Sequence, residues 1–206
     1  MSDLHRVRAD EARLAGLLAA SPAGRHGDLD PRVAGLHDSA LRPAAVLVLL
    51  ERGPGWRVVL TKRTTHVEQH KGEVSFAGGM RDPGDADPRA TALREAHEEL
   101  GLDPGAVTVL GQLPDYVTIT HFLVTPVVAA IDAGYGYRPS PDEVERVLRV
   151  PLDHVRDESQ WFDDAREFRG ERFVLRACRY EGELIWGATS RMLQSFLALL
   201  PPDLLR

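Results

Sequence analysis

The segment from Asp87 to Gly101 constrains the fold most, because it carries signals for both ends of a helix. Asp87 is a favourable N-cap residue, and Pro88 suits the first helical position. Gly101 is a typical residue just beyond a helix C-terminus. The helix between them has a stripe of apolar residues at helical spacing, formed by Leu93, Ala96 and Leu100. We therefore expect an amphipathic helix that packs through this stripe.

The same helix concentrates negative charge. Glu95, Glu98 and Glu99 lie three and four residues apart, so they share a face, and like charges at this spacing weaken a helix. With about 100° of rotation per residue, the apolar stripe lies on a different face, so we expect the carboxylates to point outward. A divalent cation such as Mg²⁺ or Mn²⁺, which prefers oxygen ligands, would offset the repulsion. A solvated charged face, with Arg94 and Glu98 as an ordinary ion pair, is the alternative that the carboxylates alone favour.

Strands and helices mix along the chain without a repeating βαβ rhythm, which favours an α+β fold. Apolar and β-branched runs predict strands at residues 44–50, 56–63, 73–79, 106–113 and 122–131, and a hairpin closed by Glu181-Gly182 at 173–180 and 183–189. Further helices are expected at residues 8–20, 142–148 and 190–200, the last ended by Pro201-Pro202.

The length of 206 residues suits one domain with an extension. A Gly-, Pro- and Asp-rich stretch at 21–35 reads as a linker, so we expect an N-terminal helix and linker at 1–40 and the main domain at 41–206. The net charge of -6 gives no reason to expect a nucleic-acid partner, and no apolar run is long enough to cross a membrane. A lone cysteine, Cys178, and an N-terminus that mixes acids with arginines favour the cytoplasm.

Gly78 and Gly79 precede the carboxylate helix, and glycine permits either a tight turn or a close backbone approach. From Gly79 onward the sequence resembles the Nudix box, whose pattern is Gly, five residues, Glu, seven residues, then Arg-Glu-aliphatic-x-Glu-Glu-x-Gly-aliphatic. The second half matches at Arg94, Glu95, Ala96, Glu98, Glu99, Gly101 and Leu102. In the first half, Asp85 replaces Glu and the gap to Arg94 is one residue longer. The resemblance implies a mixed β-sheet sandwiched between helices (α/β/α), cleavage of a diphosphate, and pairing of Asp85 with Arg94.

Residues 60–79 are similar to the stretch before the box in coenzyme A diphosphatases. The matching residues are Leu60, Thr61, Arg63, His70, Gly72, Val74, Phe76, Gly78 and Gly79. Thr64, Val67, Glu68 and Ala77 stand where that subfamily has Ser, Leu, Arg and Pro. The resemblance implies hydrolysis of coenzyme A or a derivative to 3′-phosphoadenosine 5′-phosphate and 4′-phosphopantetheine. Because Glu68 removes a cation near an anionic ligand, another nucleoside diphosphate derivative is the alternative substrate.

The resemblance also implies roles for the acidic residues. Glu95 and Glu99 would bind Mg²⁺ or Mn²⁺, with Glu98 as a further ligand or acting through water. The base that activates the attacking water is one of these residues or an acid outside the box, such as Glu143. Arg94 would orient the carboxylates, because its guanidinium can hold one in bidentate geometry.

Further residues are candidates for the substrate site. Arg63 and Lys71 suit phosphate groups, and His70 is either a phosphate or cofactor contact or a structural loop histidine. Phe76 would stack on adenine or, as we favour, pack under the loop. Gly78 and Gly79 would allow close approach of the backbone.

A non-catalytic ligand sensor on the same fold is the alternative to an enzyme, because a fold does not fix a function. A sensor needs no complete acidic set, so the presence of Glu95, Glu98 and Glu99 together favours an enzyme. The expected partner is a small molecule, and the sequence leaves a monomer and a homodimer open.

Overall fold

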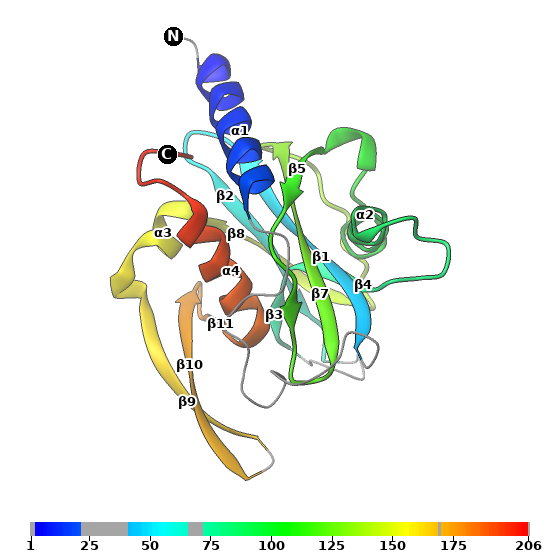
Figure 1. The fold of residues 1–206 in the computed structure, drawn as a ribbon, viewed down its shortest axis with the longest axis vertical. Coiled ribbons are helices and arrows are strands. Elements are labelled where there is room, and N and C mark those ends of the chain that lie inside the picture. The colour runs from blue at the N-terminus through cyan, green and yellow to red at the C-terminus, as the bar shows by residue number, and fades with distance from the viewer. Residues whose placement is uncertain (1–2, 22–40, 66–71, 169, 206) are drawn as a thin grey trace.

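The computed structural model describes residues 3–21, 41–65, 72–168 and 170–205. Its centre is an eight-stranded mixed sheet (Figure 1). The long strands β1 (Arg42–Arg52) and β7 (Phe122–Asp132) run parallel to each other over their full lengths. The other strands pair antiparallel: β2 (Arg57–Arg63) and β4 (Ala77–Met80) with β1, β5 (Thr108–Gln112) and β6 (Tyr116–Val117) with β7, and β3 (Val74–Ser75) and β8 (Val144–Pro151) with β2.

Strand β8 corrects the prediction of a helix at residues 142–148. Its side chains at Val144, Leu148 and Val150 are buried, and β8 pairs with β2 in the register that sets Leu60 opposite Leu148. Valine favours strands because its branched side chain packs well on a pleated surface. Pairing with a partner about ninety residues away along the chain overrides the local helical pattern.

Helices cover both faces of the sheet (Figure 1). Alternate residues of β1 point to opposite faces, so Leu47 and Leu49 enter one hydrophobic cluster while Val48 and Leu50 enter another. Helix α2 (Pro88–Leu100) packs against the first cluster, and helices α1 (Asp3–Ala20) and α4 (Gly187–Leu199) pack against the second. The expected arrangement of a mixed sheet between helices is therefore confirmed.

Helix α1 contributes to the same core as the sheet. Leu14 and Leu18 are buried in the cluster that contains Val48 and Leu50. The linker predicted at residues 21–35 lies outside the described residues except for its first position, so the boundary at residue 41 stays a prediction. No helix in the described ranges has both the length and the apolar character needed to cross a membrane.

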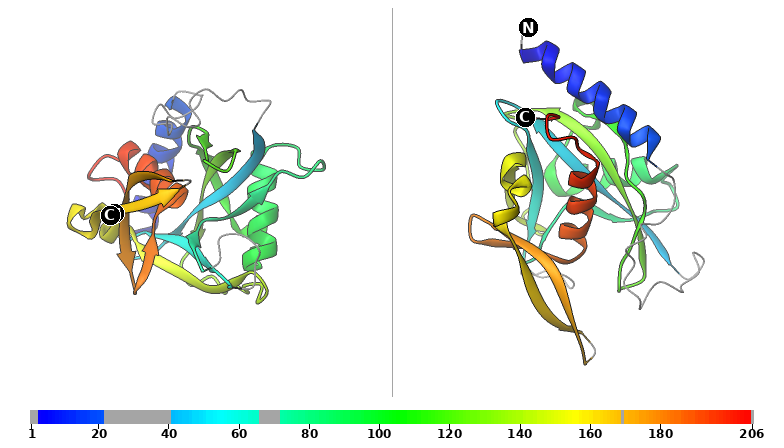
Figure 2. Two further views of the ribbon diagram at one scale, coloured as in Figure 1. Left: turned by 90° about the horizontal axis from the view of Figure 1, so that it is seen from below. Right: turned by 60° about the vertical axis from the view of Figure 1, so that its left-hand side comes forward.

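A second, three-stranded sheet follows the short helix α3 (Leu152–Arg156). It consists of β9 (Trp161–Phe168), β10 (Glu171–Tyr180) and β11 (Glu183–Ile185), and its long β9–β10 hairpin extends away from the body of the molecule (Figure 2). The predicted hairpin turn between β10 and β11 is confirmed, with Glu181 and Gly182 both at positive φ (49° and 82°). Its second strand is shorter than the predicted 183–189, because helix α4 already begins at Gly187. The described residues also include two 3₁₀ turns, Pro104–Ala106 and Glu158–Gln160.

Candidate functional site

Helix α2 carries the predicted acidic residues, and its ends are fixed as the sequence predicts. The Asp87 side chain accepts a hydrogen bond of 2.8 Å from the backbone N–H of Ala90, and Pro88 occupies the first turn. Gly101 adopts a left-handed conformation (φ 62°) beyond the last helical residue. These caps fix where each turn of the helix lies against strands β1 and β4.

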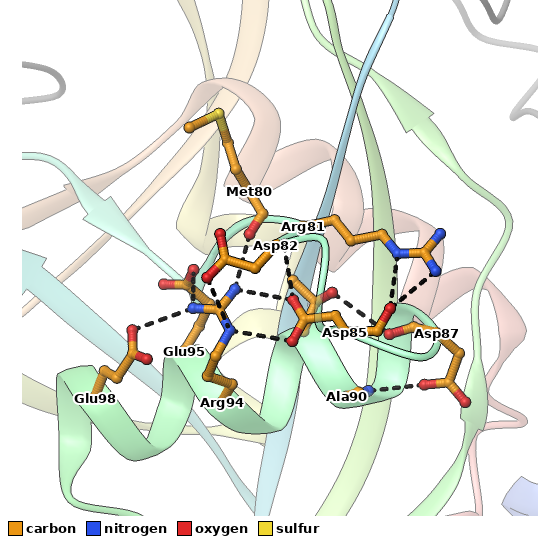
Figure 3. Close-up of polar contacts among 10 residues, drawn as sticks. Met80, Arg81, Asp82, Asp85, Asp87, Ala90, Arg94, Glu95 and Glu98 are labelled. Carbon is orange, nitrogen blue, oxygen red and sulfur yellow. Dashed lines mark hydrogen bonds and ion pairs between the residues drawn. The ribbon is translucent and has the colours of Figure 1, made fainter.

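Arg94 is the centre of a network that ties α2 to the loop before it (Figure 3). Its guanidinium donates to both oxygens of Asp85 at 3.2 and 3.0 Å and to the Met80 carbonyl at 2.9 Å. It also contacts Glu95 Oε1 at 2.8 Å and Glu98 Oε2 at 3.2 Å. The Asp85–Arg94 pair is confirmed, and hydrogen bonding to Arg94 lowers the pKa of Asp85 to about 2. Arg94 thus orients two carboxylates while the loop holds Arg94.

Gly79 lets the backbone of β4 approach the Glu95 carboxylate. A Cβ atom at this position would lie only 2.6 Å from the Oε1 atom of Glu95. At Gly78, a Cβ atom would lie 2.4 Å from the Ala45 carbonyl of β1. Both glycines lie in strand β4, so close approach rather than a tight turn explains the pair.

Glu99 corrects the expectation that the three carboxylates all point outward. The residue is only 1% exposed, because α2 buries a broad arc of residues that extends beyond the apolar stripe. Arg63 of β2 donates to Glu99 Oε1 at 3.2 Å, while Oε2 is buried without a hydrogen-bond partner. Burial, followed by the charges of Glu143 and Glu95, raises the pKa of Glu99 to about 8 although Arg63 opposes the shift. Burial likewise raises the pKa of Glu95.

These side chains fit a hard divalent cation. A buried carboxylate oxygen without a partner costs free energy that a cation would recover, and carboxylate oxygens are the ligands that Mg²⁺ and Mn²⁺ prefer. The close approach of Gly79 leaves the Glu95 carboxylate no room to retreat toward β4. Within the described ranges, no three acidic, histidine or cysteine side chains already converge as a closed metal site. The acids are instead distributed around the two guanidinium groups of Arg63 and Arg94.

The remaining described residues predicted for the substrate site lie in different parts of the structure. Arg63 contacts the acidic cluster, by which we mean Glu95, Glu98 and Glu99, through Glu99. Its Nη2 atom also lies 3.9 Å from Glu143 Oε2. Sequence reasoning missed this contact with Glu99 and Glu143, because nothing in the local pattern links the end of β2 to helix α2. Phe76 is buried in the hydrophobic core, which argues against stacking on adenine and favours a packing role. His70 and Lys71 lie outside the described residues.

Comparison with known proteins decides the family. Residues 41–188, well over half of the chain, match the profile of the NUDIX domain. The chain belongs to the Nudix family. This Nudix hydrolase is 38% identical over 153 residues to the uncharacterized Nudix hydrolase NudL of Escherichia coli K12, covering 74% of this chain and 80% of that protein. NudL of Shigella boydii serotype 18 matches with the same identity and coverage.

Solved structures agree on the fold. RenU, a Nudix hydrolase from M. smegmatis, has a TM-score of 0.53 and 23% identity, covering 78% of this chain and 88% of its own. A MutT/nudix family protein from Enterococcus faecalis has a TM-score of 0.50 and 14% identity, covering 77% of this chain and 61% of its own. The family profile and the similarity to NudL make the chain a hydrolase that acts on diphosphate bonds, and Nudix hydrolases generally use divalent metal ions such as Mg²⁺ or Mn²⁺.

Proposed function

We propose that this Nudix hydrolase cleaves the diphosphate of coenzyme A or a derivative, releasing 3′-phosphoadenosine 5′-phosphate and 4′-phosphopantetheine. The buried Glu99 carboxylate, with one oxygen unpartnered beside Glu95, is the observation that carries the catalytic part of the proposal. The similarity of residues 60–79 to coenzyme A diphosphatases supports the choice of substrate.

Glu95 and Glu99 would hold Mg²⁺ or Mn²⁺, with Glu98 as a further ligand or acting through water. When bound, the cation polarises a phosphoryl oxygen and lowers the pKa of a water molecule. The Nη1 atom of Arg94 bridges the Glu95 and Glu98 carboxylates and so holds the two near each other. Arg63 holds Oε1 of Glu99, so the Oε2 atom is left for the cation.

The reaction is a hydrolysis at phosphorus. Water forms a new O–P bond while the bridging P–O bond breaks, and the departing phosphate keeps the electron pair of that bond. A carboxylate accepts the proton of the attacking water, and Glu98 is our candidate because its side chain is half-exposed and reachable by solvent. Arg63 would contact the substrate phosphates, and from the resemblance we propose the same role for His70 and Lys71.

A product assay tests the proposal. The purified enzyme is incubated with Mg²⁺ or Mn²⁺ and with coenzyme A, acetyl-coenzyme A, ADP-ribose, NADH or dGTP, and the products are separated by chromatography. We expect preferred release of 3′-phosphoadenosine 5′-phosphate. Preferred cleavage of ADP-ribose or NADH would keep the diphosphatase chemistry and refute coenzyme A as substrate.

Glu68 gives a specific reason to include the alternative substrates. It places a negative charge where coenzyme A diphosphatases have Arg, and this disfavours the anionic 3′-phosphate that distinguishes coenzyme A from ADP-ribose. Restoring the cation with Glu68→Arg therefore separates the two substrate classes. Under our proposal the variant improves kcat/KM for coenzyme A more than for ADP-ribose.

A further inference from the structure

A turn at residues 138–143 lies between the end of helix α2 and the end of strand β2. The backbone N–H of Arg138 donates to the Leu100 carbonyl at 2.8 Å, and that of Ser140 donates to the Glu99 carbonyl at 2.9 Å. The N–H groups of Glu143 and Val144 both donate to Ser140, which closes the turn. The turn is thus attached to Glu99, the same residue whose carboxylate Arg63 contacts.

Thr64 fastens the other side of this turn. Its hydroxyl donates to the Asp142 carbonyl at 2.8 Å, and its backbone N–H donates to the Glu143 carbonyl at 2.9 Å. The Thr64 side chain is buried, so these bonds are shielded from competing water. Two bonds from one residue to successive carbonyls leave the backbone at Glu143 little freedom to rotate.

The carboxylate of Glu143 lies beside Arg63. Arg63, the neighbour of Thr64, lies between Glu99 Oε1 at 3.2 Å and Glu143 Oε2 at 3.9 Å. The negative charge of Glu143 also contributes to the raised pKa of both Glu99 and Glu95. Residues 63 and 64 therefore hold Glu143 in two ways, one through its backbone and one through its side chain.

We propose that Thr64 is a positioning residue, whose hydroxyl holds the turn so that Glu143 completes the acidic cluster formed by Glu95, Glu98 and Glu99. The inference rests on the proposed metal-dependent function. It also explains a departure from the subfamily pattern, because Thr in place of Ser keeps the hydroxyl that the Asp142 carbonyl needs.

Four variants test the inference: Thr64→Val, Thr64→Ser, Glu143→Gln and the double variant Thr64→Val/Glu143→Gln. Glu145→Gln is the matched control, because Glu145 lies on the neighbouring strand β8 with a similar exposure (48% against 44% for Glu143) and pairs instead with Lys62. Each protein is assayed for kcat and KM with Mg²⁺ and the substrate that the parent enzyme prefers in the product assay. Mn²⁺ binding without substrate is measured by electron paramagnetic resonance, and folding is checked by circular dichroism.

We expect Thr64→Val to lower kcat by about ten-fold or more with little change in KM, since a displacement of about 1 Å can cost about 10²-fold. Both Thr64→Val and Glu143→Gln should weaken Mn²⁺ binding, because a nearby negative charge is moved or removed. Thr64→Ser should restore both properties. The double variant should lie within about two-fold of Glu143→Gln alone, because Thr64 acts through Glu143.

Independent effects in the double variant would overturn the inference, as would a Thr64→Ser protein as impaired as Thr64→Val. Unchanged kcat and Mn²⁺ affinity in a folded Glu143→Gln would overturn it even if Thr64→Val fails to fold. Each of these results would refute only the positioning role of Thr64. The proposed function would stand as long as the parent enzyme cleaves its substrate. A parent enzyme that neither binds Mn²⁺ nor cleaves any substrate would refute the proposed function, and the inference with it.

Discussion

Replacing Gly79 by Ala tests whether the position of the Glu95 carboxylate sets the rate. The added Cβ would lie 2.6 Å from Cδ and Oε1 of Glu95 and 2.7 Å from Oε2. Non-bonded carbon atoms pack at about 3.5–4.0 Å, so the carboxylate must retreat by about 1 Å. A misplacement of this size costs about 10²-fold in turnover, which is about 2.7 kcal/mol of activation free energy.

The same substitution should have little effect on folding. The atoms that would have to move form the far end of a flexible side chain, and Gly79 is not among the residues at positive φ. The free energy of unfolding should therefore change by less than about 1 kcal/mol. Gly84→Ala is the matched control, because Gly84 lies in the loop that follows and a Cβ there meets no atom within 4 Å.

The assay compares kcat at saturating substrate and Mg²⁺ with urea unfolding for the parent and both variants. The expected result is a loss of about 10²-fold for Gly79→Ala alone, with all three unfolding midpoints nearly equal. If Gly79→Ala keeps the kcat of Gly84→Ala, the position of Glu95 does not limit the reaction. A large drop in the unfolding midpoint would show that Gly79 serves the sheet rather than the site.

Three further outcomes are expected. Glu99→Gln should keep the fold, because a neutral amide is less costly to bury than a carboxylate. The variant should lose most of its turnover, and near-normal activity with Mg²⁺ would contradict the assignment of Glu99 as a metal ligand. Asp85 has a pKa lowered to about 2 by Arg94, so its contribution to stability is complete above its unfolded pKa of about 3.9 and is lost as the pH falls toward 2. Asp85→Asn should flatten urea-unfolding midpoints over that range, and an unchanged acid dependence would argue against the pair. Burial raises the pKa of the Cys178 thiol to about 11, so it should react with a thiol reagent only as the protein unfolds, and rapid labelling of the native enzyme would refute this.

The helix ends were predictable because their signals are local. Asp87, Pro88 and Gly101 each act on backbone groups within a few residues, and the structure uses each as expected. Strand β8 was not predictable from its own residues, because its pairing with β2 depends on chain segments far apart in the sequence. Strand β9 was missed for a similar reason, since its mixed charged sequence is held by pairing with β10.

The acidic cluster was predictable in composition and only partly in geometry. The spacing of Glu95, Glu98 and Glu99 places them near one another, as found. The burial of Glu99 depends on the rotation of α2 about its own axis relative to the sheet and on the contact with Arg63 of β2. Neither factor is encoded in the sequence of the helix, so helical periodicity alone predicts that Glu99 is exposed, whereas it is buried.

The loop before α2 has an evolutionary consequence. Asp85 is one methylene shorter than the Glu of the family pattern, and the chain from it to Arg94 is one residue longer. Both Asp85 oxygens still reach the Arg94 guanidinium, at 3.2 and 3.0 Å. The short side chain and the long loop therefore compensate for each other. A lineage that passes between the two forms of the box must change both features together or cross an intermediate in which Arg94 is poorly held.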